Sequence, residues 1–149
     1  MNDQKIKIVF VCLGNICRSP IAEFVMKSLL GDRCAIESRA TSSWEHGNPI
    51  HSGSQEVMKE HGISFDSSKS SQQIDLVDFS HFDYIIGMDQ SNLRDLKQMA
   101  PQSLHHKIYA FSEQDIPDPW YTGDFQETYD LIVQGCQDWK SRLSKSHHF

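Results

Sequence analysis

The sequence of 149 residues predicts a single α/β domain, residues 1–149, built on a four-stranded parallel sheet with helices on both faces. Its length is that of one ordinary globular domain, and 38% hydrophobic residues are enough to form a core. Short apolar runs alternate with amphipathic segments along the chain, as a parallel sheet with helical crossovers requires. The first run, Ile6–Cys12, is almost continuously apolar, which is typical of a strand buried on both faces.

A strand-loop-helix pattern opens the chain. The strand Ile6–Cys12 is rich in β-branched residues and is followed by Gly14 and Asn15. Ser19 is expected to be the N-cap of the following helix, with Pro20 as its first residue. Apolar residues then recur every four positions before the stop signal of Gly31, at Ile21, Val25 and Leu29. We therefore expect a tight loop that leads directly into a helix N-terminus.

The rest of the chain repeats this alternation. Three further strands are expected, each a short apolar or β-branched run: Ala35–Arg39, Asp83–Met88 and Lys107–Ala110. Two helices are expected between them, each followed by a glycine or a proline: Gln55–His61 and Ser91–Met99. Beyond Phe125, apolar residues at intervals of three or four predict a long C-terminal helix: Tyr129, Ile132, Cys136, Trp139 and Leu143.

Charge and composition exclude several classes of function. The 14 Lys and Arg against 20 Asp and Glu give a net charge of −6, so no nucleic-acid partner is expected. No stretch approaches the roughly 20 apolar residues of a membrane span. The sequence shows no signal peptide, no C-x2-C pair and no histidine spacing typical of metal ligands. We expect a cytoplasmic protein without metal or cofactor, and export that needs no signal peptide stays open.

A C-x5-R-S motif occupies the loop after the first strand. Five residues separate Cys12 from Arg18: Leu13, Gly14, Asn15, Ile16 and Cys17. Ligands of open α/β sheets bind at the carboxyl ends of strands, where this loop is expected. Its backbone N–H groups, the helix N-terminus and the Arg18 guanidinium would together bind a phosphate dianion. The same field favours a thiolate, so Cys12 is expected to be a nucleophile. We also expect a left-handed backbone at Gly14, and Asn15 tolerates one as well.

Four separate segments of the chain form a recognisable set: VCLGNICRSP at Val11–Pro20, SRATSSW at Ser38–Trp44, FDYIIGMDQSN at Phe82–Asn92 and PDPWYTGDFQETY at Pro117–Tyr129. In their residues, order and spacing, over nearly the whole chain, they resemble the low molecular weight protein tyrosine phosphatases of bacterial type. The resemblance implies hydrolysis of phosphotyrosine and small aryl phosphates through a phosphocysteine intermediate. It implies phosphotyrosine proteins and a tyrosine kinase as partners, with inorganic phosphate or a similar oxyanion as product and inhibitor.

The resemblance also gives roles to individual residues. Cys12 would attack phosphorus while Arg18 and the loop amides hold the phosphate oxygens. Asp118 would protonate the leaving phenolate and later activate water. Ser19 would hydrogen-bond the departing Cys12 sulfur, and Asp89 would orient the site. Outside this motif context, Asp118 before a proline would indicate a turn, and Asp89 would indicate a helix N-cap.

Three aromatic residues match the walls of the family's substrate slot: Trp44, Trp120 and Tyr121. A nucleophile at the bottom of such a slot is reached by a phosphorylated phenol but poorly by the shorter phosphoserine. Core packing is the alternative role, more so for Trp44 than for the other two, which Pro119 and Gly123 bracket in an expected surface loop.

The other cysteines have different expected roles. Oxidation of Cys12 to a sulfenic acid would be resolved by Cys17 as a disulfide, and the alternative for Cys17 is a small buried residue. Cys34 and Cys136 are expected in the core.

Two other functions begin from the same loop. An arsenate reductase on this fold relays oxidation to a cysteine pair in the part of the chain that corresponds to Ile85–Arg94, where this sequence has none. A phosphotyrosine-binding module without turnover would need neither Cys12 nor Asp118. The chain departs from many family members away from the expected reaction centre, at Ala40, Lys69, Gln72 and Trp120. The changes at Lys69 and Gln72 are expected to alter how the loop is braced.

Overall fold

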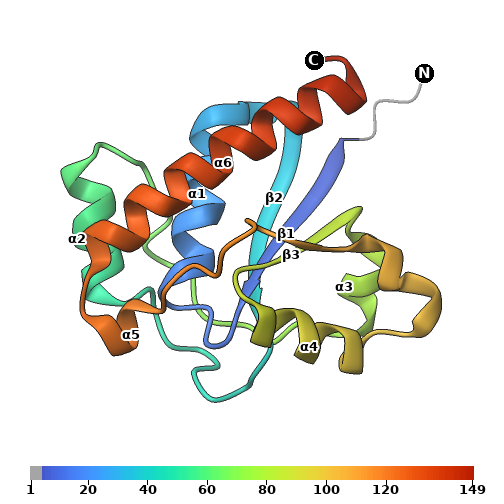
Figure 1. The fold of residues 1–149 in the computed structure, drawn as a ribbon. Helices are drawn as coiled ribbons and strands as arrows, with labels where there is room; N and C mark the ends of the chain where they lie inside the picture. The colour runs from blue at the N-terminus through green and yellow to red at the C-terminus, as the bar shows by residue number, and fades with distance from the viewer. Residues whose placement is uncertain (1–4) are drawn as a thin grey trace.

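The computed structural model describes residues 5–149 and contains one four-stranded, all-parallel sheet (Figure 1). Its strands follow the order β2-β1-β3-β4, with bounds β1 (Ile6–Cys12), β2 (Cys34–Ala40), β3 (Tyr84–Gly87) and β4 (Ile108–Ala110). β1 pairs with β2 along its whole length, from Ile6 opposite Cys34 to Cys12 opposite Ala40. The predicted fold class is confirmed.

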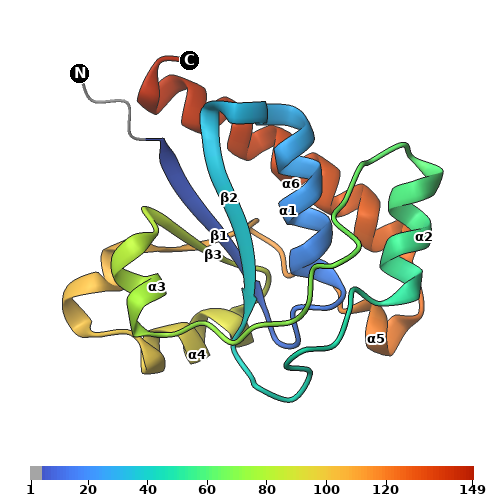
Figure 2. The ribbon, with the colours of Figure 1, turned by 180° about the vertical axis from the view of Figure 1, so that it is seen from behind.

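Helices cover both faces of this sheet (Figures 1 and 2). On one face lie α1 (Arg18–Leu30), α2 (Ser52–Glu60) and α6 (Phe125–His147). On the other lie α3 (Leu76–His81) and α4 (Gln90–Met99). One-turn α5 (Pro119–Thr122) lies next to α2, and short 3-10 helices span Gly31–Arg33 and Gln102–Lys107. No helix within residues 5–149 combines the length and apolar character that crossing a membrane requires.

Alternation along β1 divides the core into two layers. Ile8, Phe10 and Cys12 belong to the cluster that packs under α1 and α6. Val9 and Val11 belong to the second cluster, which packs against α3 and α4. Successive side chains of a strand point to opposite faces, so the nearly continuous apolar run of β1 supplies both layers.

The topology places one loop at the centre of the sheet edge. From β1 the chain passes through α1 to β2 on one side, and later returns to β3 on the other side. The order of the strands therefore switches at β1, and the crevice beyond its carboxyl end is where open α/β sheets bind ligands. The Cys12–Arg18 loop begins there.

Three local predictions need correction. α1 begins at Arg18, so Ser19 and Pro20 lie within its first turn, and the N-cap position falls on Cys17, whose side chain makes no capping hydrogen bond. Gly14 does not have a positive φ, whereas Asn15 does, at 56°. The helix predicted at Gln55–His61 begins earlier, at Ser52.

Two short helices were not predicted from the sequence. They are α3, which a capping box between Asp75 and Asp78 begins, and α5, which lies in the segment expected to be a surface loop. Both are too short to show a hydrophobic period, so only their capping residues could have indicated them.

Candidate active site

The loop after β1 folds around the sulfur of Cys12. The backbone N–H groups of Asn15 and Ser19 donate to Cys12 Sγ at 3.3 and 3.4 Å, and the Ser19 hydroxyl lies 3.1 Å from it. Cys12 is buried, with 2% of its surface exposed. Two backbone N–H groups and one hydroxyl, from the loop and the first turn of α1, therefore converge on this sulfur. The Ser19 hydroxyl thus contacts the Cys12 sulfur and does not cap α1, whose N-cap position is Cys17.

Asn15 holds the loop in shape. It has the left-handed backbone that had been expected at Gly14, and its side chain is buried. Its amide nitrogen Nδ2 donates to Ser19 Oγ at 2.8 Å and to Ser38 Oγ at 3.0 Å, while its Oδ1 accepts from the Gln72 backbone N–H at 3.2 Å. A short polar side chain is among the few that adopt this backbone region readily. At Gly14 a Cβ would lie 3.3 Å from Glu45 Cγ, so a larger residue there would require the Glu45 side chain to shift by a few tenths of an ångström.

A buried ionic network lies behind Asn15. Ser38 Oγ donates to Glu23 Oε1 at 2.6 Å, and the Lys69 ammonium lies 3.4 Å from the same oxygen. Lys69 also donates to the Ser38 carbonyl at 2.9 Å. Burial lowers the pKa of Lys69, and the charge of Glu23 opposes that shift. Lys69 and Gln72, two positions at which the chain departs from many family members, therefore both contact residues that brace the loop.

Arg18 connects the loop to two carboxylates from distant parts of the chain. Its Nη1 donates to Asp89 Oδ2 at 2.7 Å and to the Ile116 carbonyl at 2.9 Å, and its Nη2 lies 3.5 Å from Asp118 Oδ2. Burial opposes its charge, but Cys12, Asp89 and Asp118 outweigh burial and raise the pKa of Arg18. Within residues 5–149, the buried Nε of Arg18 has no hydrogen-bond partner, so a donor remains for an oxyanion.

Each of the two carboxylates also begins a helix. Asp89 is the N-cap of α4, where its Oδ1 accepts from the Asn92 N–H at 2.7 Å. Asp118 is the N-cap of α5, where its Oδ1 accepts from the Trp120 N–H at 3.0 Å. The N-cap role that the sequence left as the alternative for Asp89 is therefore present together with its contact to Arg18. Asp118, whose alternative was a turn, instead caps a one-turn helix while it also contacts Arg18.

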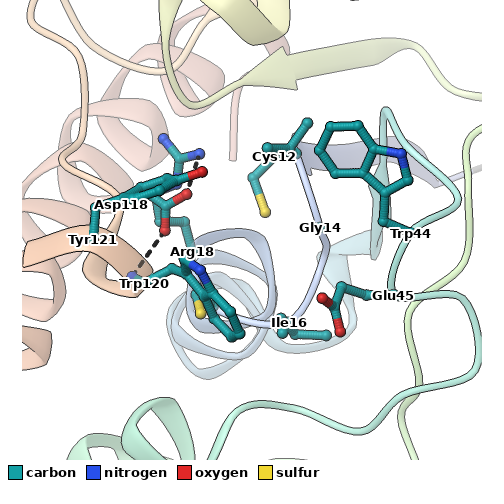
Figure 3. A pocket seen from close by; sticks show the side chains of 11 residues that line it. Cys12, Gly14, Ile16, Arg18, Trp44, Glu45, Asp118, Trp120 and Tyr121 are labelled. Atoms are coloured by element: carbon teal, nitrogen blue, oxygen red, sulfur yellow. Dashed lines mark hydrogen bonds and ion pairs between the residues drawn. The ribbon is translucent and has the colours of Figure 1, made fainter. Parts of the chain in front are cut away.

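A pocket of about 250 Å³ opens above Cys12. Figure 3 shows Trp44 and Glu45 on one side of the Cys12 sulfur and Asp118, Trp120 and Tyr121 on the other. The three aromatic residues are exposed, Trp44 by 76%, Trp120 by 56% and Tyr121 by 76%, so none of them is a core residue. The pocket is thus a slot between aromatic rings with a cysteine and an arginine at its base.

The other cysteines are buried. Burial raises the pKa of Cys17, and negative charge on Cys12 raises it further, so Cys17 is a thiol at neutral pH. Cys12 and Cys17 are not joined by a disulfide in this structure. The core positions predicted for Cys34 and Cys136 are confirmed. Across the part of the chain that the structure describes, no group of His, Cys, Asp and Glu has an arrangement that could hold a metal ion.

Sequence reasoning missed several residues of this site. Glu45 lines the pocket, and its place directly after Trp44 was the available signal. Glu23 and Ser38 lie beneath the loop, and His51 contacts the ring of Trp120. Ser38 begins the SRATSSW segment but was given no role from the sequence. Glu23 and His51 lie 11 and 39 residues from Cys12, and no local pattern links them to it.

Comparisons with known proteins agree on one family. A family model described as low molecular weight phosphotyrosine protein phosphatase matches residues 7–148. The low molecular weight protein-tyrosine-phosphatase PtpA of Staphylococcus aureus is 41% identical over 142 residues, which cover 89% of this chain and 90% of that protein. The crystal structure of SP-PTP from Streptococcus pyogenes is 58% identical, with a TM-score of 0.89 and coverage of 97% and 99%. That of YfkJ from Bacillus subtilis is 38% identical, with a TM-score of 0.91 and coverage of 97% and 98%.

Proposed function

The chain belongs to the low molecular weight phosphotyrosine protein phosphatase family and is a protein tyrosine phosphatase, and on that premise we propose how its own residues perform the hydrolysis. Cys12 is the nucleophile, Arg18 binds the phosphoryl oxygens, and Asp118 is the general acid and then the general base. The observation that supports this assignment best is that all three side chains line one pocket, with Cys12 and Arg18 at its base and Asp118 on one side of the Cys12 sulfur (Figure 3).

In the first step, Cys12 Sγ forms a bond to phosphorus while the bond from phosphorus to the phenolic oxygen breaks. The electron pair of that bond goes to the phenolic oxygen, which takes a proton from Asp118. The Nε of Arg18 and the amides of the loop hold the three equatorial oxygens, whose charge they stabilise.

In the second step, Asp118 removes a proton from a water molecule. The water oxygen bonds to phosphorus, the sulfur–phosphorus bond breaks, and its electron pair returns to Cys12. Ser19 Oγ, 3.1 Å from the sulfur, donates a hydrogen bond to the departing thiolate. Inorganic phosphate is then the product and should compete with substrate for the same loop.

The substrate class follows from the walls of the pocket. Trp44 lies on one side of the sulfur, and Trp120 and Tyr121 lie on the other, so a phenyl ring attached to the phosphate fits between aromatic rings. Each aromatic contact contributes about 0.5 to 1.5 kcal/mol beyond the burial of area. Phosphoserine has no ring to place there, and its shorter side chain would hold the phosphate above the sulfur.

Hydrolysis of p-nitrophenyl phosphate and phenyl phosphate tests the assignment. We expect Cys12→Ser to lose at least about a thousandfold in kcat. Asp118→Ala should lose about a hundredfold or more in kcat/KM with phenyl phosphate, and much less with p-nitrophenyl phosphate, whose leaving group departs without a proton. Equal losses with the two substrates would contradict the role of Asp118.

A matched control separates chemistry from the loss of a helix cap. Asp75 caps α3 through Asp78 on the opposite face of the sheet, so Asp75→Ala removes an N-cap without touching the pocket. It should keep wild-type kcat/KM with both substrates. A phosphoserine peptide and arsenate complete the series: arsenate reduction would favour the reductase alternative, and phosphate binding without turnover by the wild type would favour a binding module.

A further inference from the structure

The half-buried imidazole of His51 lies where three segments around the pocket meet. Its backbone N–H donates to the carbonyl of Ile16, in the loop that holds Cys12, at 2.8 Å. Its ring nitrogen Nδ1 accepts from the backbone N–H of Gly53 at 2.9 Å, which makes His51 the N-cap of α2. These two hydrogen bonds fix the residue at both its backbone and its ring.

The ring also contacts two aromatic residues from the end of the chain. It stacks on Phe125, the first residue of α6, with centroids 4.9 Å apart and an interplanar angle of 25°. It meets Trp120 edge-on, at 5.8 Å and 84°. A Cβ at Gly53 would lie only 2.5 Å from the Phe125 ring, so only a glycine lets that ring lie against the first turn of α2. The imidazole therefore lies between a firmly packed ring and a ring of the pocket wall.

The segment that carries Trp120 has little other packing. In α5 only Pro119 is buried, while Trp120 and Tyr121 are exposed. Asp118 caps this helix through the N–H of Trp120, so a shift of Trp120 moves the hydrogen-bond donor that orients the Asp118 carboxylate. Figures 1 and 2 both show α5 beside the lower end of α2, where His51 lies at the N-terminus.

We propose that His51 is a positioning residue for the reaction, whose ring, fixed by Gly53 and supported by Phe125, holds Trp120 in the wall and thereby holds Asp118 toward the leaving group. This inference rests on the proposed function of Asp118. It differs from a purely structural role because the ring contact affects the step in which the phenolate takes a proton.

Two substitutions at His51 separate its ring from its cap. His51→Asn keeps an acceptor for the Gly53 N–H and removes the ring, while His51→Phe keeps a ring between Phe125 and Trp120 and removes the acceptor. We expect His51→Asn to lower kcat/KM with phenyl phosphate by about twofold to tenfold, the range of one aromatic contact, and to lower it less with p-nitrophenyl phosphate. His51→Phe should recover most of that loss. The opposite order, with His51→Asn like the wild type and His51→Phe impaired, would overturn the proposal.

His61 provides a matched control at the other end of α2. Its ring stacks on Tyr129 of α6 at 4.3 Å and 15°, but it contacts neither Trp120 nor the pocket. His61→Asn therefore removes a comparable imidazole–aromatic contact between the same two helices, and it should leave the ratio of kcat/KM for the two substrates unchanged. A change of that ratio equal to the change in His51→Asn would also overturn the proposal.

A double-mutant cycle with Trp120 tests the route of the effect. In a Trp120→Ala background, His51→Asn should change the ratio of the two substrates by less than about twofold, because the ring it supports is gone. A full, additive effect would show that His51 does not act through Trp120. If Asp118→Ala loses equally with phenyl phosphate and p-nitrophenyl phosphate, the proposed function of Asp118 fails. If Asp118→Ala loses more with phenyl phosphate but His51→Asn changes neither substrate's kcat/KM, only the role of His51 fails.

Discussion

Replacement of Asn15 should test whether its buried side chain or its backbone angle holds the loop between Cys12 and Arg18. The side chain of Asn15 makes three hydrogen bonds. Its Nδ2 donates to Ser19 Oγ and Ser38 Oγ, and its Oδ1 accepts from the backbone N–H of Gln72. Its backbone has a φ of 56°, where a residue with a Cβ is strained unless its side chain is short and polar. Asn15→Ala loses both features, whereas Asn15→Gly loses only the hydrogen bonds.

The structure gives an expected magnitude for each variant. A buried hydrogen bond contributes about 1 kcal/mol, so the loss of three costs about 3 kcal/mol in Asn15→Gly. Alanine in the left-handed region adds about 1 kcal/mol, which gives about 4 kcal/mol for Asn15→Ala. Chemical denaturation measures both free energies of unfolding, and the difference between the variants isolates the backbone contribution.

Activity should fall with the loop geometry. The N–H of Asn15 donates to Cys12 Sγ, and its side chain holds Ser19, whose N–H and hydroxyl contact the same sulfur. We expect kcat/KM for p-nitrophenyl phosphate to fall at least about tenfold in both variants, because each 1.4 kcal/mol lost in the transition state is a factor of ten. If the free energy of unfolding of Asn15→Gly lies within about 0.5 kcal/mol of the wild-type value and the variant keeps its activity, the hydrogen bonds of the Asn15 side chain do not hold the loop.

Three further predictions concern the other polar and ionic features of the site. Peroxide should inactivate the wild type reversibly through a Cys12–Cys17 disulfide, so Cys17→Ala should recover less activity on treatment with thiol, and equal recovery would contradict this. Burial lowers the pKa of Lys69 in the folded state below its ordinary value of 10.5. Between these two pKa values the unfolded state binds more protons at this residue than the folded state does, so Lys69 makes the free energy of unfolding rise with pH. Lys69→Met should therefore show a smaller rise in the free energy of unfolding between pH 8 and pH 10 than the wild type. An unchanged rise would contradict this prediction. The net charge of −6 and the carboxylate of Glu45 at the pocket should disfavour acidic residues beside phosphotyrosine. Glu45→Gln should therefore raise kcat/KM for acidic phosphotyrosine peptides by about twofold to fivefold relative to neutral ones. Equal kcat/KM for both types of peptide in the wild type would refute this charge effect.

Features that depend on local pattern could be predicted from the sequence. The strand Ile6–Cys12 and the long helix from Phe125 lie where hydrophobic periodicity placed them, because burial on two faces or on one stripe leaves a direct trace in residue order. The C-x5-R-S motif is also local, since consecutive backbone amides around Cys12 need only a short stretch of chain. The first turn of α1 was less predictable, because Ser19 suits either a helix cap or a contact with sulfur.

The sequence by itself therefore determined the fold class, the loop after β1 and the residue types that line the pocket. Only the tertiary structure decided which side chains meet there. Arg18 contacts Asp89 and Asp118, which follow it by 71 and 100 residues, and Asn15 reaches Ser38 over 23 residues. His51 likewise joins the loop to Trp120. Such contacts depend on how sheet and helices pack in three dimensions, and packing brings together residues whose separation along the chain shows no period.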